Sequence, residues 1–321
     1  MRISDGAPGA RILAFGGYQP ARVVTNDEVG SMVDADDEWI RDRVGIVSRR
    51  IAAPDETVAD LAVAAGGKAL AGSGLAAADV DLVIAATCTP EVMIPNTAPT
   101  VARRLGIPAP GAYDLNAACA GFCYALAAAS DAVRAGSARH VLVVGAEKLS
   151  QWVDWTDRST CIIFADGAGA AVVGPATGTA DPGIGPVAWG SAGEMADRIF
   201  ISDRGSFIVQ EGQAVFRWAT TALHPVARLA CERAGVDPAE LAVIVPHQAN
   251  LRIIGAIARG IGAPQATVAN DIVTAGNTAA ASIPLALSRL RERGEIPSGS
   301  LALLIGYGAG ICFAAQVIRL P

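Results

Sequence analysis

The sequence holds few of the residues that build metal centres, disulfide frameworks or nucleic-acid surfaces. Its 321 residues include three histidines and six cysteines without a C-x-x-C pair, which argues against a zinc site and a disulfide scaffold. The net charge is -6 at pH 7, so no general affinity for nucleic acid or anionic lipid is expected. No apolar run reaches the roughly 18 residues of a membrane span, and no signal-peptide pattern opens the chain. We therefore expect a cytoplasmic protein that binds no metal, nucleic acid or membrane.

Apolar residues dominate the composition and fall in short runs. They make up 52% of the chain, against 17% charged residues, which favours a compact interior over disorder. Continuous apolar runs at 81–87 and 241–246 predict strands buried on both faces. A 3.6-residue period at 57–70 and 220–235 predicts helices. This alternation indicates α/β layers.

The chain repeats one layout at half its length. The segment beginning at Gly74 aligns with the one beginning at Gly235, a shift of 161 residues. Farther along, a shift of 158 residues places Cys119 opposite Asn277, each at the start of an alanine-rich helix. Because the two helices occupy equivalent places, they can pack against one another between two sheets.

Apolar strands at 141–147 and 301–308 follow the two copies in the same order. The sequence therefore predicts a five-layer α-β-α-β-α sandwich built from two duplicated halves, residues 1–175 and 176–321.

One cysteine stands at a reactive position. Cys119 follows a short strand and lies in the first turn of a predicted helix. The unpaired N–H groups of a helix N-terminus carry roughly half a positive charge, which lowers the pKa of a thiol. We therefore predict that Cys119 is a nucleophile, whereas Cys123, one turn deeper, is predicted to be core.

Polar groups of the second half stand where they can face this thiol. His247 ends the buried strand at 241–246, and functional groups of α/β sheets gather at such strand ends. Asn277 shares the place of the cysteine in the repeat. The glycines of GYGAG, residues 306–310, let a backbone N–H approach a reacting oxygen closely.

Several blocks of the sequence resemble the β-ketoacyl-[acyl carrier protein] synthase III family of the thiolase superfamily. In order and spacing, the similar blocks are DLNAACAGF (114–122), VPHQANLRI (245–253), AGNTAAASIPLA (275–286) and GYGAG (306–310). Further similar blocks are DDEWIRDRVGI (36–46), DRSTCIIFADGAGAAVVG (157–174) and EGQAVFRWA (211–219). The resemblance covers nearly the whole chain and implies a thiolase-like fold.

The resemblance implies a homodimeric condensing enzyme that starts fatty-acid synthesis. Cys119 would take a short acyl group from acyl-CoA, which is a substrate and not a tightly bound cofactor. Malonyl-[acyl carrier protein] would then lose CO₂ while His247 and Asn277 stabilise the enolate oxygen. The backbone N–H groups of Cys119 and Ala309 would hold the oxyanion of each tetrahedral stage.

The resemblance also implies five residues that bind CoA. Adenine would stack between the ring of Trp39 and the guanidinium of Arg43, and Arg158 corresponds to a further CoA-binding position. Asn250 and Arg252 correspond to positions at the pantetheine arm and the basic mouth of the tunnel. Because the protein is acidic overall, these arginines would supply the local phosphate site.

Some positions depart from the family pattern. Gln213 and Ala279 stand where relatives often carry other small or polar residues, and the segment 195–213 is shorter than in similar bacterial proteins. Ile94 stands where a bulky aromatic can close the acyl pocket. We expect a pocket wider than acetyl needs, able to take short branched or longer primers.

Other functions remain open at this point. A starter-unit ketosynthase of polyketide synthesis has the same chemistry, and none of these residues separates it from the fatty-acid enzyme. A non-decarboxylating acyltransferase of the same fold is disfavoured by Asn277, whose implied role is at the enolate. A non-catalytic protein is disfavoured because Cys119, His247 and Asn277 are all present.

Overall fold

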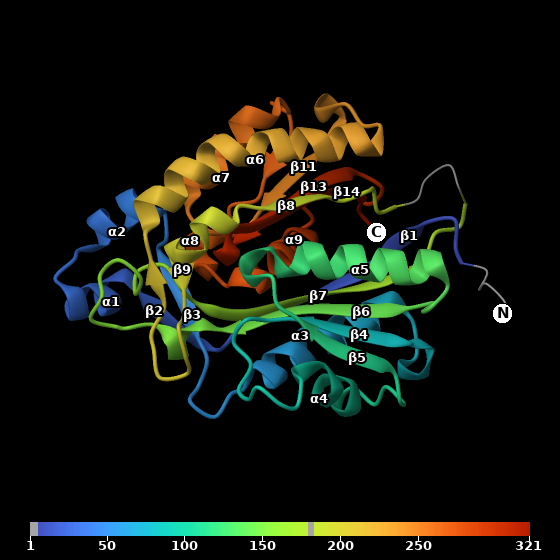
Figure 1. Ribbon diagram of the computed structural model, residues 1–321, viewed down its shortest axis with the longest axis horizontal. Helices are drawn as coiled ribbons and strands as arrows, with labels where there is room; N and C mark the ends of the chain where they lie inside the picture. The colour runs from blue at the N-terminus through green and yellow to red at the C-terminus, as the bar shows by residue number, and fades with distance from the viewer. Residues whose placement is uncertain (1–5, 179–182) are drawn as a thin grey trace.

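The computed structural model describes residues 6–178 and 183–321, arranged as two sheets between three layers of helices (Figure 1). The first sheet has the order β1-β7-β6-β4-β5. Its strands are β1 (Ala10–Tyr18), β4 (Leu82–Ala86), β5 (Gly111–Leu115), β6 (Val141–Lys148) and β7 (Asp166–Pro175). The second sheet has the order β12-β11-β13-β14-β8. Its strands are β8 (Ala188–Ser191), β11 (Val243–Pro246), β12 (Thr267–Val268), β13 (Leu301–Gly308) and β14 (Cys312–Arg319).

The two sheets share one topology. In the first, β1, β7 and β6 pair antiparallel, and β6, β4 and β5 pair parallel. In the second, β8, β14 and β13 pair antiparallel, and β13, β11 and β12 pair parallel. The duplicated layout predicted from the sequence is confirmed.

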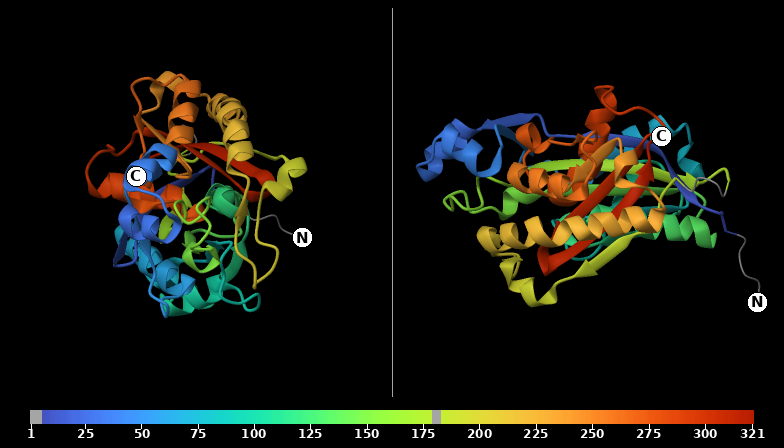
Figure 2. Two further views of the ribbon diagram at one scale, coloured as in Figure 1. Left: turned by 90° about the vertical axis from the view of Figure 1, so that its left-hand side faces the viewer. Right: turned by 90° about the horizontal axis from the view of Figure 1, so that it is seen from above.

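Helices cover both sheets and fill the space between them. The central layer holds α5 (Gly121–Ala135) and α9 (Ser282–Glu292), and the outer layers hold α3 (Val58–Ser73) with α4 (Thr97–Arg104), and α6 (Gly212–Ala234) with α7 (Leu251–Ile261). Seen from above, α6 and α7 lie over the second sheet (Figure 2). Three buried apolar clusters separate these layers, one at each sheet–helix interface on the outside and one around the central helices. The five-layer sandwich is confirmed.

Glycine lets the central helix lie directly on a strand. A Cβ at Gly169 of β7 would stand 2.3 Å from the backbone nitrogen of Leu285 in α9, so only glycine permits this spacing. The glycine-rich run of β7 is therefore a packing feature.

The remaining elements surround one end of the sandwich. They are α1 (Asn26–Val33), α2 (Asp37–Val44), α8 (Ile272–Ala275), the pair β2 (Arg22–Thr25) and β3 (Ser48–Ile51), and the pair β9 (Ile199–Phe200) and β10 (Val209–Gln210). In Figure 1 they lie on the side of the N-terminal end of α5. Among the helices of the described residues, none is long and apolar enough to cross a membrane.

At the turns before the central helices the repeat keeps the shift of 161 residues. Ala118 and Ala279 precede the central helices with φ of 46° and 43°, which continues the shift of 161 residues found at Gly74 and Gly235. The counterpart of Asn277 is therefore Asn116. The predicted pairing of Cys119 with Asn277 is wrong, because it matched small residues by type, whereas the two turns match by backbone conformation.

Candidate active site

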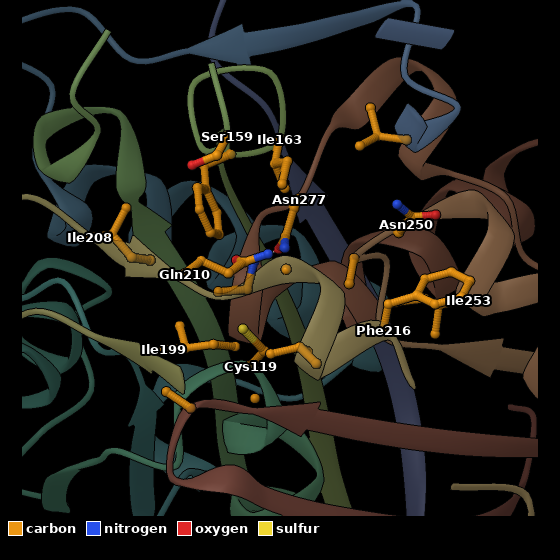
Figure 3. A pocket seen from close by; sticks show the side chains of 18 of the residues that line it. Cys119, Ser159, Ile163, Ile199, Ile208, Gln210, Phe216, Asn250, Ile253 and Asn277 are labelled. Carbon is orange, nitrogen blue, oxygen red and sulfur yellow. The ribbon is translucent and has the colours of Figure 1, made fainter. Parts of the chain in front are cut away.

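A cavity of about 850 Å³ opens at the N-terminal end of α5 (Figure 3). All nine residues singled out from the sequence line it: Cys119, His247, Asn277, Ala309, Trp39, Arg43, Arg158, Asn250 and Arg252. Figure 3 shows Cys119, Gln210 and Asn277 around the cavity, with Ile199 and Ile208 on one side and Phe216 and Ile253 on the other. Its walls are largely apolar, as expected of a site that holds an acyl chain or a pantetheine arm.

Cys119 lies in a short 3-10 turn that leads into α5. The turn is Ala118–Ala120, and α5 begins at Gly121. The α-helix therefore starts two residues after Cys119 and does not include it, contrary to the prediction from the sequence. The end of β13 lies against this turn, since a Cβ at Gly308 would stand 2.5 Å from the backbone nitrogen of Cys119. Ala309 opens the next 3-10 turn, Ala309–Ile311, and the first N–H groups of a helical turn have no acceptor within it. Cys119 and Ala309 thus line one cavity from neighbouring turns.

The expected low pKa of the cysteine is wrong for the resting protein. Burial raises the pKa of the Cys119 thiol to about 12, and the nearby Glu147 carboxylate raises it further. The side chain is partly accessible from the cavity, but the protein packed on its other sides withdraws it from bulk water. Desolvation therefore outweighs the favourable backbone amide, and the thiol is protonated at neutral pH.

Glu147 is a buried carboxyl beside the thiol that sequence analysis missed. It accepts hydrogen bonds from the hydroxyl groups of Thr87 at 3.1 Å and Thr89 at 2.5 Å, and from the backbone N–H of Cys88 at 3.1 Å. Burial raises its pKa to about 7. The available signal was the pair of charged residues, Glu147 and Lys148, at the end of the otherwise apolar strand β6.

His247 is held as a neutral ring. It follows β11 and is buried, with its ring edge-on to Tyr307 at a centroid distance of 5.2 Å. Burial lowers the pKa of His247 to about 3, so the ring is uncharged at neutral pH.

Ser282 fixes the orientation of this ring. Its Oγ lies 2.7 Å from Nδ1 of His247 and accepts the backbone N–H of Gln248 at 3.3 Å. Because the Ser282 oxygen already accepts the N–H of Gln248, its O–H can donate to Nδ1 of His247. The proton of the neutral ring then lies on Nε2. Sequence analysis missed Ser282, although it is the first hydroxyl after the alanine run that follows Thr278.

Asn277 is fixed by three hydrogen bonds. Its backbone N–H donates to the carbonyl of Ile163 at 3.0 Å, and its carbonyl accepts from Ala165 at 2.9 Å. Its side-chain Oδ1 accepts the N–H of Ala279 at 2.9 Å. Because Oδ1 is engaged in this turn, the Nδ2 group is the donor that the side chain can offer to a ligand.

Aromatic and basic groups line the outer part of the cavity. The guanidinium carbons of Arg43 and Arg158 lie 5.0 Å and 4.6 Å from the ring centroid of Trp39, and that of Arg252 lies 5.6 Å from the ring of Phe216. These are cation–π distances. The predicted adenine slot is thus occupied by the arginines themselves.

Asn250 joins the two sides of the cavity mouth. Its Oδ1 accepts the N–H of Arg252 at the start of α7, at 2.8 Å, and its Nδ2 donates to the carbonyl of Arg43 in α2 at 2.9 Å. Both polar atoms are therefore engaged in the wall.

No metal centre accompanies these groups in the part of the chain that the structure describes, where no three His, Cys, Asp or Glu side chains are grouped as ligands. A cysteine at the start of a buried central helix, together with an imidazole and a carboxamide from the other half of a duplicated five-layer sandwich, defines a thiolase-fold acyl-transferring enzyme.

Comparisons with known proteins identify the family. The models for 3-oxoacyl-[acyl-carrier-protein (ACP)] synthase III match residues 113–193 and, for its C-terminal part, residues 231–320. A β-ketoacyl-[acyl-carrier-protein] synthase III of Streptomyces coelicolor is 59% identical over 313 residues, which covers 98% of this chain and 99% of that protein. A mycobacterial counterpart from Mycobacterium tuberculosis is 49% identical over 333 residues, covering 100% and 98%. The chain belongs to the β-ketoacyl-[acyl-carrier-protein] synthase III family, as its motifs predicted.

Solved structures agree with this assignment. The priming β-ketosynthase of a polyketide biosynthetic pathway superposes with a TM-score of 0.96 at 44% identity, covering 100% of this chain and 98% of that one. A 3-oxoacyl-[acyl-carrier-protein] synthase III from Aquifex aeolicus gives 0.92 at 39% identity, covering 97% and 100%.

Proposed function

We propose that this protein condenses a short acyl group from acyl-CoA with malonyl-[acyl carrier protein], releasing CO₂ and a β-ketoacyl carrier protein. The observation that carries the proposal is that one cavity is lined by Cys119, neutral His247 and Asn277, whose side chains supply a nucleophile and two uncharged hydrogen-bond donors.

In the first half-reaction the sulfur of Cys119 attacks the thioester carbonyl of acyl-CoA. The carbonyl oxygen becomes an oxyanion that the N–H groups of Cys119 and Ala309 hold. The C–S bond to CoA then breaks, and the thiol proton ends on the departing CoA sulfur. Because the resting thiol is protonated, the anion forms during this exchange and is not stored beforehand.

In the second half-reaction malonyl-[acyl carrier protein] loses CO₂. The electron pair of the broken C–C bond passes into an enolate, whose oxygen accepts hydrogen bonds from Nε2 of His247 and Nδ2 of Asn277. The enolate carbon attacks the acyl-Cys119 carbonyl, and the cysteine sulfur leaves. Two neutral donors suit this step, because a cationic imidazolium would protonate the carbanion.

We propose that CoA enters past Trp39, Arg43 and Arg158, with Asn250 and Arg252 at the mouth. The stacked guanidinium groups support this, since they present positive charge beside an aromatic face. Adenine would replace one guanidinium on the ring. CoA acts here as a substrate, and the proposed cycle needs no tightly bound cofactor and runs in the cytoplasm.

A second copy of the chain is the proposed partner. Met93 and Ile94 are 79% and 88% exposed, although both are large and apolar, and β5 stands at the edge of its sheet. Such a surface favours a protein partner, and a homodimer would cover it. Light scattering that gives the mass of one chain at working concentration would refute the dimer.

Within each copy, the proposed halves divide after Pro175, where β7 ends.

Priming of a polyketide pathway is the second candidate. The structural similarity to a priming polyketide β-ketosynthase favours it, and the chemistry of the cavity is the same. A panel of acyl-CoA primers with two malonyl carrier proteins, one from each pathway, separates the candidates by relative kcat/KM. Ile94, expected from the sequence to stand at the acyl pocket, is exposed and does not line the cavity of this chain. The size of the largely apolar cavity itself predicts that branched or longer primers exceed acetyl-CoA.

The test of the proposed reaction is CO₂ release. With acyl-CoA and malonyl carrier protein, CO₂ and β-ketoacyl carrier protein should form in equal amounts. Transfer of the acyl group to an alcohol or amine without CO₂ release would assign the protein to the non-decarboxylating acyltransferases instead.

A further inference from the structure

The same strained turn occurs twice at the cavity. Asn116 Oδ1 accepts the N–H of Ala118 at 3.0 Å, and Asn277 Oδ1 accepts the N–H of Ala279 at 2.9 Å. Both alanines have positive φ, 46° and 43°, a left-handed conformation that a residue with a Cβ adopts rarely. In each case the 3-10 turn and then a central helix follow at once.

In both turns the asparagine is the group that favours the unusual conformation. An Asn side chain that accepts the N–H two residues ahead replaces a backbone turn and stabilises the bend. Without that acceptor, Ala118 has no intrinsic preference for φ of 46°. The residue immediately after it is Cys119, so the direction of the nucleophile depends on this one angle.

The other side of the turn is fixed by β13. Because a Cβ at Gly308 would stand 2.5 Å from the nitrogen and 2.9 Å from the Cβ of Cys119, the cysteine cannot move toward that strand. Asn116 lines the cavity on which Cys119 opens. The nucleophile is thus held between a rigid strand and a turn that one side chain maintains.

We propose that Asn116 is a positioning residue for Cys119, which it serves by holding Ala118 in the left-handed conformation. This inference rests on the proposed function, because the step it controls is acylation. Decarboxylation depends on His247, which Ser282 orients, and on Asn277, which belongs to the second copy of the turn. Asn116 and Asn277 therefore serve different half-reactions through the same local structure.

The experiment compares Asn116→Ala, Asn116→Ser and the double variant Asn116→Ala/Ala118→Gly. Asn116→Ala should slow single-turnover acylation by acyl-CoA about 10- to 100-fold, since small displacements of a reacting group have effects of this size. Malonyl carrier protein decarboxylation without acyl-CoA should change less than about threefold. Asn116→Ser should lose less, because a serine hydroxyl can accept the same N–H.

The double variant distinguishes positioning from direct contact. Glycine adopts a positive φ without steric cost, so Ala118→Gly should restore much of the acylation rate that Asn116→Ala loses. Asn270→Ala, an exposed asparagine outside the cavity, is the matched control. No rescue by glycine, or equal losses in acylation and decarboxylation, would overturn the proposal.

A second readout is independent of acyl-CoA. Site-resolved alkylation of Cys119 by iodoacetamide should slow in Asn116→Ala and recover in the double variant. If the wild type forms no acyl adduct, the proposed function fails, whereas the alkylation rates still decide the role of Asn116. If thermal unfolding shows that Asn116→Ala does not fold, the Asn116→Ser variant and the double variant supply the same comparison. In that case, alkylation and acylation rates of Asn116→Ser equal to those of the wild type, together with no effect of Ala118→Gly, would refute the positioning role of Asn116.

Discussion

Two substitutions at Asn277 separate its chemical role from its structural one. Asn277→Ala removes both the Nδ2 donor and the Oδ1 atom that accepts the N–H of Ala279 at 2.9 Å. Asn277→Asp keeps an oxygen at that position but replaces the donor with a second acceptor. If the side chain only maintained the turn, the aspartate variant would behave like the wild type.

The expected size of the effect follows from the loss of one enolate donor. Removing one preorganised oxyanion donor costs about 3 to 4 kcal/mol, a factor of roughly 10² to 10³ in rate. Both variants should lose decarboxylation by at least this factor, and Asn277→Asp should lose more, because its carboxylate opposes the negative enolate. Acylation of Cys119 should stay within about tenfold, because that step uses backbone donors from other turns.

The assay measures the two half-reactions separately. CO₂ release from malonyl carrier protein reports decarboxylation, and CoA release in a single turnover reports acylation. Retained decarboxylation in Asn277→Asp, or equal losses of both steps in Asn277→Ala, would refute the assignment of Nδ2 to the enolate.

Three further predictions follow from the contacts around the cavity. Gly308→Ala places a Cβ 2.5 Å from the Cys119 nitrogen. The free energy of unfolding, measured in urea, should therefore fall by about 1 to 3 kcal/mol, and the rate of acylation should fall as well. An unchanged free energy of unfolding and acylation rate would contradict the close packing. Glu147→Gln removes a carboxyl group whose pKa is raised by burial from 4.5 to about 7. Between these two values the carboxyl is ionised in the unfolded state and protonated in the folded state. The free energy of unfolding of the wild type therefore falls by up to about 3 kcal/mol as the pH rises from 4.5 to about 7. The stability of Glu147→Gln relative to wild type should therefore increase between pH 5 and 8, and a constant difference would exclude this ionisation. Ser282→Ala frees Nδ1 of His247 and should slow decarboxylation roughly tenfold while sparing acylation, a split that equal losses would contradict.

Strand and helix order could be predicted because buried runs and small-residue helices leave a direct pattern in the sequence. The convergence of His247 and Cys119 could also be predicted, since each follows the carboxyl end of a strand, β11 and β5, in its own sheet.

The details of the turns could not be predicted. Ala118 and Ala279 look like ordinary helical alanines in sequence, and only the backbone shows their positive φ. This conformation sets the register of the repeat, so matching by residue type paired Cys119 with the wrong partner.

Electrostatic values depend on tertiary burial, which a local pattern does not contain. The position of Cys119 at a helix start suggested a low pKa, but desolvation and Glu147 act in the opposite direction. Neither the depth of the sulfur nor the carboxyl at the end of another strand can be read from the residues near position 119.

The central claim is that Cys119 carries the acyl group between the two half-reactions. Intact-protein mass spectrometry after mixing with acyl-CoA should show one acyl adduct, which peptide mapping places on Cys119 and which malonyl carrier protein discharges. An adduct that persists in Cys119→Ala, or one that malonyl carrier protein leaves in place, would contradict the account.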